Sequence, residues 1–242
     1  MRATRVRHFD RALAGVTVGA FLCLVVSACV GGNASPKSLH PNAATTLPPT
    51  TATTALAPPR SGESASALVS RLAVAPEGSM GGYDRARFGT WIDADGDGCD
   101  TRAEVLLRQS RVPPQVDPFG CAVVAGEWLS SYDGRTTEDP AALDIDHVVA
   151  LAEAWRSGAA AWDDGRRRAF ANDLDQPGEL VAVTAAANRS KGDHDPASWR
   201  PPNRASWCEF GIGWVRTKLK WGLTADRPEV RALDDMLRDC TT

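Results

Sequence analysis

Two short runs of apolar and β-branched residues, each ending in polar side chains, constrain the fold of this chain more than any other feature. The first run, ALDIDHVVAL at residues 142–151, has the composition of a strand. The second run, ELVAVTAAANRSKGD at residues 179–193, predicts a short strand that leads directly into a helix. Together they predict two strands and a helix that bring polar residues to one place.

The polar residues of the first run include His147, one of the two histidines in the domain. Asp144 and Asp146 share one face of the strand because successive residues alternate, whereas His147 points to the other face or emerges at the strand end. Taken alone, a histidine in such a run is more often a hydrogen-bonded core residue than a catalyst. The second run favours a functional role. Its helix start carries Asn188, Arg189 and Lys191.

This combination of side chains fits the site of a single-metal phosphodiesterase. One carboxylate and one amide oxygen can hold a hard cation such as Mg²⁺ and leave water positions open for a phosphate. A neighbouring imidazole can take the proton from the attacking water, since its pKa lies near working pH. A basic side chain offsets the negative charge of the transition state. The alternative is a polar helix end that closes on Gly192 and has no function.

The same residues carry a resemblance to a known family. DIDHVVALAEAW, followed by ANDL and then LVAVTAAANRSKGDHDPASWRPP, resembles the HNH endonucleases. Within that family it is similar to the secreted branch related to the C-terminal domain of the GmrSD restriction enzymes. The resemblance spans about residues 83–240 and includes GCDTR near its start. It implies an α+β fold, in which a ββα-metal core is surrounded by inserted and C-terminal helices.

The resemblance also implies roles for individual residues. Asp146 and Asn188 match the metal ligands of the family, and His147 matches its general base. Asn172 of FANDL is the best match for the middle asparagine, which steadies the loop that carries the histidine, although its spacing to Asn188 is longer than in compact HNH motifs. Lys191 resembles the basic residue after the helical asparagine and would contact phosphate.

The function implied by the resemblance is hydrolysis of phosphodiester bonds in nucleic acid. DNA is favoured over RNA as the substrate, and the cofactor would be one Mg²⁺ or Mn²⁺ ion. Asp144 would not bind the metal itself but would orient the metal-bound water or His147. His194, in the turn-like sequence GDHDP, is expected to be a bystander.

A different function is suggested by DADGDGCDTRAE at residues 93–104, which has the pattern of a twelve-residue calcium loop. Its acidic ligands would be Asp93, Asp95, Asp97 and Glu104. The alternative to an enzyme is therefore a non-catalytic extracellular module that binds calcium. Only half of the motif is present, because residues 87–91 before the loop are a poor helix.

The resemblance assigns the same loop to the scaffold. GCDTR leading into a helix is expected even where the preceding aspartates are absent. The loop would then anchor a disulfide through Cys99, present Arg102 toward the active-site face, and hold a structural Ca²⁺ ion.

The cysteines indicate an exported protein with two disulfides. The chain has six, of which Cys23 lies in the leader and Cys29 directly follows a small residue. Four remain, an even number that predicts two bridges in an oxidising compartment. The pairing Cys99–Cys121 with Cys208–Cys240 is favoured because it closes short local loops. A zinc site is disfavoured, because the sequence has no C-x-x-C pair.

The N-terminal residues predict export and a tether. Residues 1–29 combine a basic start with an apolar run ending LVVSAC, which is typical of a signal peptide. Its end resembles a bacterial lipobox, so lipid on Cys29 would anchor the chain to the outer face of the cytoplasmic membrane; ordinary cleavage would leave it secreted. Residues 30–66 predict a disordered tether rich in Pro, Thr and Ala, and residues 67–242 one nuclease-like domain, expected to be a monomer.

The charge of the domain excludes binding of nucleic acid by bulk attraction. Residues 1–65 hold six of the 27 basic and two of the 30 acidic residues, so residues 66–242 carry 21 basic and 28 acidic residues, a formal charge of −7. Domains that grip nucleic acid through bulk charge are usually strongly basic. Any phosphate chemistry must therefore depend on a local site and metal ions.

The remaining sequence predicts helices around the core. The spacing of apolar residues favours helices at residues 151–162, 166–174, 207–221 and 228–238. Trp155, Trp162 and Trp199 are interpreted as core residues rather than platforms for bases. The three arginines at residues 166–168 are expected on a solvated helix face.

Overall fold

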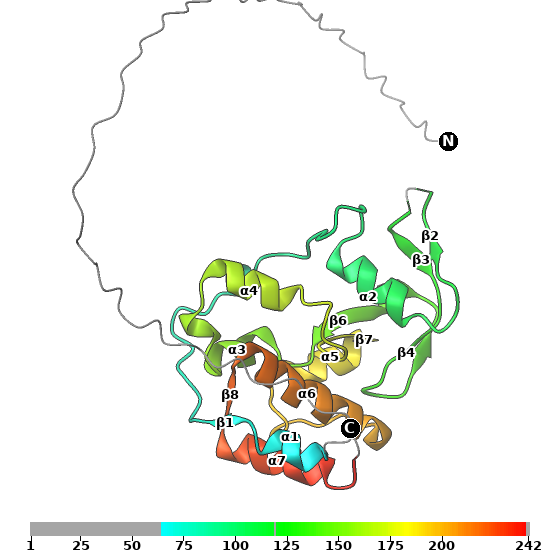
Figure 1. Cartoon of the computed structure of the whole chain (residues 1–242). Coiled ribbons are helices and arrows are strands. Elements are labelled where there is room, and N and C mark those ends of the chain that lie inside the picture. The colour runs from blue at the N-terminus through cyan, green and yellow to red at the C-terminus, as the bar shows by residue number, and fades with distance from the viewer. Residues whose placement is uncertain (1–63, 119, 241–242) are drawn as a thin grey trace, which may run out of the picture. The chain divides into compact units, whose positions relative to one another are not determined.

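The computed structural model describes residues 64–118 and 120–240 (Figure 1). The signal peptide, the lipobox cysteine Cys29 and nearly all of the tether expected at residues 30–66 lie outside the described residues. The first helix, α1 (Ala65–Val69), begins two residues before the expected domain boundary at residue 67, and its Ala65 is fully buried. In the described part of the chain, no helix is both long enough and apolar enough to span a membrane.

The centre of the fold is a ββα unit. Strands β6 (Leu143–His147) and β7 (Leu180–Thr184) pair in antiparallel fashion, from Leu143 opposite Thr184 to His147 opposite Leu180. Helix α5 (Ala185–Lys191) follows β7 directly, and the Thr184 side chain caps its first turn by accepting from the backbone N–H of Ala187. The predicted strand, strand and helix are therefore confirmed, as is the mixed α+β class.

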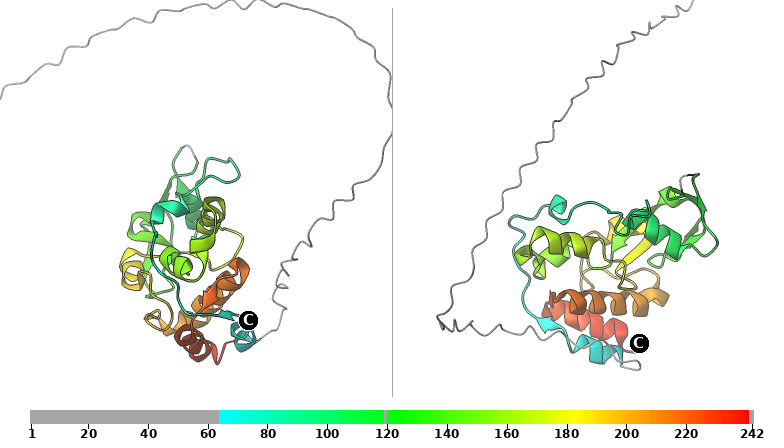
Figure 2. Two further views of the ribbon diagram at one scale, coloured as in Figure 1. Left: turned by 90° about the vertical axis from the view of Figure 1, so that its left-hand side faces the viewer. Right: turned by 45° about the horizontal axis from the view of Figure 1, so that its top comes forward.

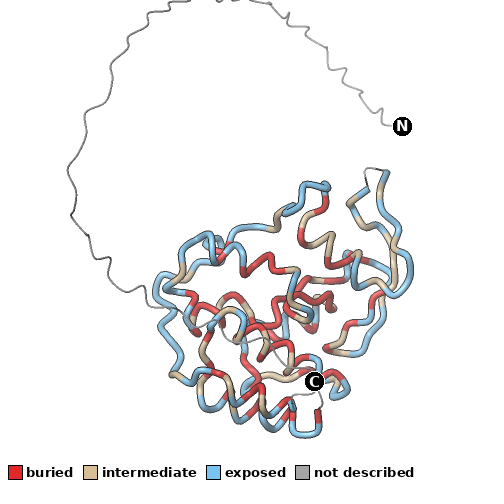
Figure 3. The backbone as a smooth tube through the Cα atoms, viewed as in Figure 1, coloured by how far each residue is buried: buried red, intermediate tan, exposed pale blue. Residues whose placement is uncertain are grey.

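The two faces of this strand pair belong to two different apolar clusters. Leu143, Ile145, Leu180 and Ala182 pack with helix α2 (Thr101–Gln109) and Trp128. Val181 and Val183, on the opposite face, join the larger core that the other helices build. The strand pair is thus buried from both sides, as Figure 3 shows for the centre of the molecule.

Four further helices surround the unit. They are α3 (Leu151–Arg156), α4 (Asp164–Ala171), α6 (Trp207–Trp221) and α7 (Arg227–Leu237). Helices α1, α6 and α7 lie side by side in one layer (Figures 1 and 2). Helix α7 begins at a capping box, in which Asp226 and Glu229 satisfy each other's backbone N–H groups. The closing helices predicted from the sequence are confirmed to within one residue at each end.

The inserted helix predicted at residues 151–162 is interrupted. Helix α3 ends at Arg156, and Gly158 takes a φ of 132°, a value that glycine adopts without strain. A short 3₁₀ turn, η3 (Ala159–Ala161), follows. Arg167 of α4 also differs from expectation: it is buried, and it donates to the carbonyl oxygens of Ala159 and Trp162 instead of facing solvent.

Short strand pairs and two disulfides tie the periphery together. The strand pairs are β1 (Ala73–Val74) with β8 (Thr224–Ala225), β2 (Gln115–Val116) with β3 (Val123–Ala125), and β4 (Trp128–Leu129) with β5 (Thr136–Thr137). The disulfides join Cys99 to Cys121 and Cys208 to Cys240, which is the pairing favoured by the sequence.

A pair of carboxyl groups lies in the core between β7 and α6. Glu179 is fully buried next to Asp173, and the indole N–H of Trp221 donates to both, at 3.3 Å and 3.1 Å respectively. Burial, together with the negative charge of Asp173, raises the pKa of Glu179 to about 10. Glu179 is therefore protonated at neutral pH, whereas Asp173 stays ionised and pairs with Lys220.

This arrangement makes stability depend on pH. Between about pH 4.5 and pH 10 the unfolded chain releases the Glu179 proton and the folded chain retains it, so Glu179 lowers the free energy of unfolding progressively as the pH rises. Glu179→Gln should remove that loss. The free energy of unfolding of the variant, relative to that of the wild type, should therefore increase as the pH rises from mildly acidic to mildly alkaline values. Urea unfolding across this range measures it, with the exposed Glu138→Gln as control. If the free energy of unfolding changed with pH in the same way in the wild type and in Glu179→Gln, the raised pKa of Glu179 would be contradicted.

Candidate active site

A cavity of about 380 Å³ opens at the end of β6. Asp146 and His147 reach it from the last two positions of the strand, and Asn188 and Arg189 reach it from α5. Its other wall includes Arg85, from the segment that precedes α2. The two sequence runs are thus brought together at one cavity, as expected.

His147 is held as a neutral imidazole. Its Nε2 lies 2.8 Å from the carbonyl oxygen of Ala171, which can only accept, so Nε2 carries the proton and Nδ1 keeps a lone pair. The ring stacks between Trp91 and Phe170, with centroid distances of 5.3 Å and 6.1 Å. Burial lowers the pKa of His147 to about 3, assisted by the nearby charge of Arg85. The expectation of a pKa near working pH is therefore wrong.

Asp146 is fixed by two donors. The hydroxyl of Tyr132 donates to its Oδ2 at 2.6 Å, and the ammonium group of Lys191 lies 2.8 Å from the same oxygen and 3.1 Å from Oδ1. Burial raises the pKa of Asp146, while the positive charge of Lys191 acts in the opposite direction.

Lys191 has a different position from the one expected. Its side chain is fully buried, and besides Asp146 it donates to the backbone carbonyl of His147 at 2.9 Å. A phosphate contact is not available to an ammonium group that is enclosed in this way. Lys191 instead joins the end of α5 to the end of β6 and so positions both residues.

Asp144 orients Asn188. The amide nitrogen of Asn188 donates to Oδ2 of Asp144 at 3.0 Å, which leaves the amide oxygen of Asn188 as the free acceptor. Asp144 therefore supports the cavity through Asn188, a contact that the sequence did not predict. Asp146 and Asn188 together offer carboxylate and amide oxygens, the donors that Mg²⁺ and Mn²⁺ prefer, so the residues present fit a hard divalent cation.

Comparison with known proteins gives the family. Residues 103–233 match the model of the C-terminal domain of GmrSD restriction endonucleases. The chain belongs to this family. An uncharacterized secreted protein of Arthroderma benhamiae is 43% identical over 180 residues, covering 74% of this chain and 86% of that protein. No solved structure matches the chain.

Within this GmrSD-type domain, Asn172 supports His147 from a distance. Its Oδ1 accepts from the backbone N–H of Ile92 and the hydroxyl of Thr101, and its Nδ2 donates to the carbonyl oxygens of Thr90 and Arg168. These four bonds hold the end of α4, where the carbonyl oxygen of Ala171 accepts from His147. This position agrees with the steadying role that the resemblance implied.

The loop at residues 93–104 does not form a helix–loop–helix calcium site. The carboxylates of Asp93, Asp95 and Asp97 lie within 4.8 Å of one another and are exposed. Glu104 is not part of this group, because it lies in α2 and pairs with Arg108 at 2.7 Å. The short 3₁₀ helix η1 (Arg85–Phe88) ends five residues before the loop, so no helix leads directly into it.

The other expected positions lie outside the cavity. Arg102 donates to the carbonyl oxygens of Pro140 and Leu143, at the far end of β6 from His147. His194 donates from Nδ1 to the carbonyl oxygen of Lys191 at 2.8 Å, a contact within its own turn. Sequence reasoning missed several residues that contact or line the site, four of them in segments outside the two runs and α4, because no motif spacing links them to it. These four are Tyr83, Arg85, Trp91 and Tyr132.

The buried pair of Lys191 and Asp146 predicts a large effect on stability. Lys191→Met removes the positive charge and leaves Asp146 uncompensated in the interior, so the free energy of unfolding at neutral pH should fall by about 3–5 kcal/mol. Arg108→Met breaks a pair that is half exposed and should cost less than about 1 kcal/mol. Urea denaturation of both variants measures the difference. Equal small effects would show that the Lys191 pair does not hold the site together.

Proposed function

We propose that this protein is an exported, metal-dependent endonuclease that hydrolyses phosphodiester bonds of nucleic acid, with DNA as the preferred substrate. The observation that carries the proposal is the meeting of Asp146, His147 and Asn188 in one cavity, within a GmrSD-type C-terminal domain. Each side chain is held by its own partner in a geometry suited to its role.

His147 is the proton acceptor. Its Nε2–H is engaged by the carbonyl of Ala171, and stacking against Trp91 and Phe170 prevents the ring from turning. The lone pair on Nδ1 therefore keeps one direction and accepts the proton of the attacking water. A base with a pKa of about 3 accepts a proton poorly from ordinary water, so the water must be acidified before His147 can take its proton.

Asp146 and Asn188 would hold the divalent cation. When bound, Mg²⁺ or Mn²⁺ would lower the pKa of a water molecule and neutralise charge on the phosphate. Tyr132 and Lys191 keep the carboxylate of Asp146 in place. Asp144 accepts from the amide nitrogen of Asn188, so the amide oxygen of Asn188 points away from the Asp144 carboxylate. The protein thus supplies preorganised oxygen ligands and an oriented base.

Export is supported by the leader-like residues 1–29 and by the secreted relative. Two disulfides in the domain are consistent with an oxidising compartment. Lipidation of Cys29, anchorage to the outer face of a bacterial cytoplasmic membrane and a monomeric state remain parts of this proposal that follow from the sequence.

Replacement of His147 tests the proposal. His147→Ala should lower Mg²⁺- or Mn²⁺-dependent nicking of supercoiled plasmid by at least about 10²-fold, the usual contribution of a general base. Because the ring is buried, His147→Gln serves as a second variant that keeps more of the packing. His194→Ala is the matched control and should retain activity, since His194 lies outside the cavity. Circular dichroism checks that each variant is folded. Wild-type rates in both folded His147 variants would refute the proposal.

A further inference from the structure

The segment of residues 77–92 contributes Tyr83 and Arg85 to the lining of the cavity and is held at both ends. At its first end, the backbone N–H of Gly78 donates to the carbonyl oxygen of Arg156 at 2.8 Å, and Glu77 pairs with the Arg156 guanidinium at 3.4 Å. At its second end, Asn172 donates to the carbonyl oxygen of Thr90 and accepts from the backbone N–H of Ile92. The segment precedes the region matched by the family model, which begins at residue 103.

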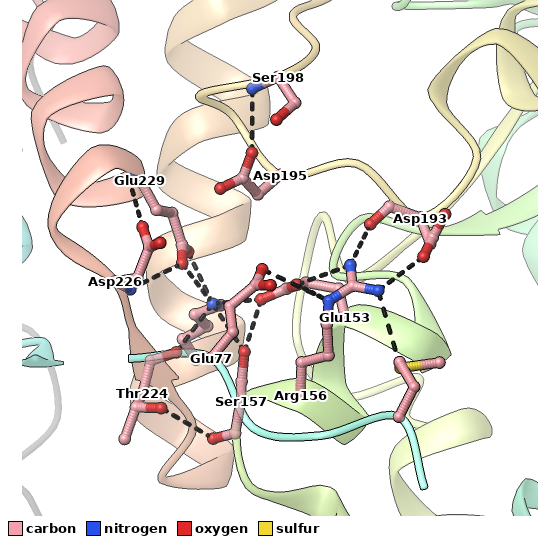
Figure 4. A network of polar contacts seen from close by, with 12 residues as sticks. Glu77, Glu153, Arg156, Ser157, Asp193, Asp195, Ser198, Thr224, Asp226 and Glu229 are labelled. Atoms are coloured by element: carbon pink, nitrogen blue, oxygen red, sulfur yellow. Dashed lines mark hydrogen bonds and ion pairs between the residues drawn. The ribbon is translucent and has the colours of Figure 1, made fainter. Parts of the chain in front are cut away.

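Arg156 couples the first end to the cavity itself. Its guanidinium donates to the carboxylate and to the backbone carbonyl of Asp193, both at 2.6 Å, and Asp193 lines the cavity. The same guanidinium pairs with Glu153, which lies in a buried network with Lys218. Figure 4 shows Arg156 between Glu153 and Asp193. Arg156 therefore connects the first end of the segment to Asp193 on the cavity wall.

The middle of the segment is fixed while one of its side chains is left free. Asp84 caps η1 by accepting from the backbone N–H of Ala86, and Phe88 is fully buried against Phe170. Arg85, between these anchors, is exposed and lines the cavity. Its positive charge acts on both Asp146 and His147.

A second arginine of the same kind lines the cavity. Arg189 is also exposed and lines the cavity from α5. Within residues 64–118 and 120–240, neither guanidinium has a hydrogen bond or an ion pair. The other cations at this place are neutralised, Lys191 by Asp146 and Arg156 by Asp193. Arg85 and Arg189 are therefore the two positive charges at the cavity that are available to an anion.

We propose that Arg85 and Arg189 bind consecutive phosphates of the nucleic-acid strand from two sides of the cavity, so that residues 77–92 supply half of the phosphate-binding surface. A guanidinium presents a planar set of donors that matches a phosphate in bidentate fashion. This local pair explains how a domain with a formal charge of −7 can hold a polyanion. The proposal rests on the nuclease function and adds the residues that position its substrate.

The test is the salt dependence of binding. His147→Gln serves as the background, so that a fluorescein-labelled single-stranded DNA oligonucleotide is not cleaved while fluorescence anisotropy is measured over a range of salt concentrations. Each phosphate contact contributes about 0.7 to the slope of log K against log salt for single strands. Addition of Arg85→Ala should weaken binding and reduce that slope by about 0.7, and Arg189→Ala should do the same.

Two further variants separate a contact from a general loss of charge. Arg231→Ala removes the same charge from an exposed position on α7, outside the cavity, and should leave the slope unchanged. Arg85→Lys keeps the charge but loses the bidentate fork, so it should retain the slope and bind more weakly. In the cleaving protein, Arg85→Ala should raise KM more than it lowers kcat.

The outcomes distinguish this proposal from the nuclease function. An unchanged slope and KM in Arg85→Ala, in a protein that cleaves DNA, would overturn the role of Arg85 and leave the function intact. Absence of cleavage by the wild-type protein with Mg²⁺ or Mn²⁺ would overturn the nuclease function, whatever Arg85 does. Full cleavage by the folded His147→Gln protein would overturn the role of His147 as the base. A slope lowered equally by Arg85→Ala and Arg231→Ala would show only bulk attraction and would also reject the proposal.

Discussion

The site depends on one buried ion pair, that of Lys191 with Asp146. The ammonium group bonds the carboxylate and the backbone carbonyl of His147, so the end of α5 is joined directly to the end of β6. Asn188 lies one turn earlier on the same helix, so the Lys191–Asp146 pair also determines where the Asn188 amide reaches the cavity. An uncompensated charge at this depth would be costly, and the three candidate site residues, Asp146, His147 and Asn188, therefore keep their relative positions.

Around this pair, the support of each functional side chain comes from a different part of the chain. Tyr132 precedes β6, the carbonyl that holds His147 ends α4, and Trp91 belongs to the segment before α2. The ββα unit supplies the reactive groups, but a histidine that is buried, neutral and held in one tautomer needs all of these neighbours. Its low pKa has the same origin, since the surrounding side chains that orient the ring also exclude water.

Much of the fold could be predicted because it depends on local patterns. The strands at Asp146 and at Val181, the helix carrying Asn188 and the closing helices all follow from hydrophobic period and turn residues. The predicted inserted helix failed at Gly158, where a positive φ ends the helix despite apolar spacing that would allow it to continue. The calcium-loop pattern at residues 93–104 also misled in part, because Glu104 turns to Arg108 instead of the aspartates.

By itself, the sequence determined which residue types occur together and on which elements, in a chain with a leader-like start and an even number of cysteines. Tertiary structure alone decided how those residues are used. It buried Lys191 beneath the site, turned Asp144 toward Asn188, and brought Arg85 to the cavity from a segment with no recognisable motif. The reason is physical, since element type follows from interactions between near neighbours in the chain. Burial, pKa and the pairing of charges depend on contacts between residues that are distant in sequence.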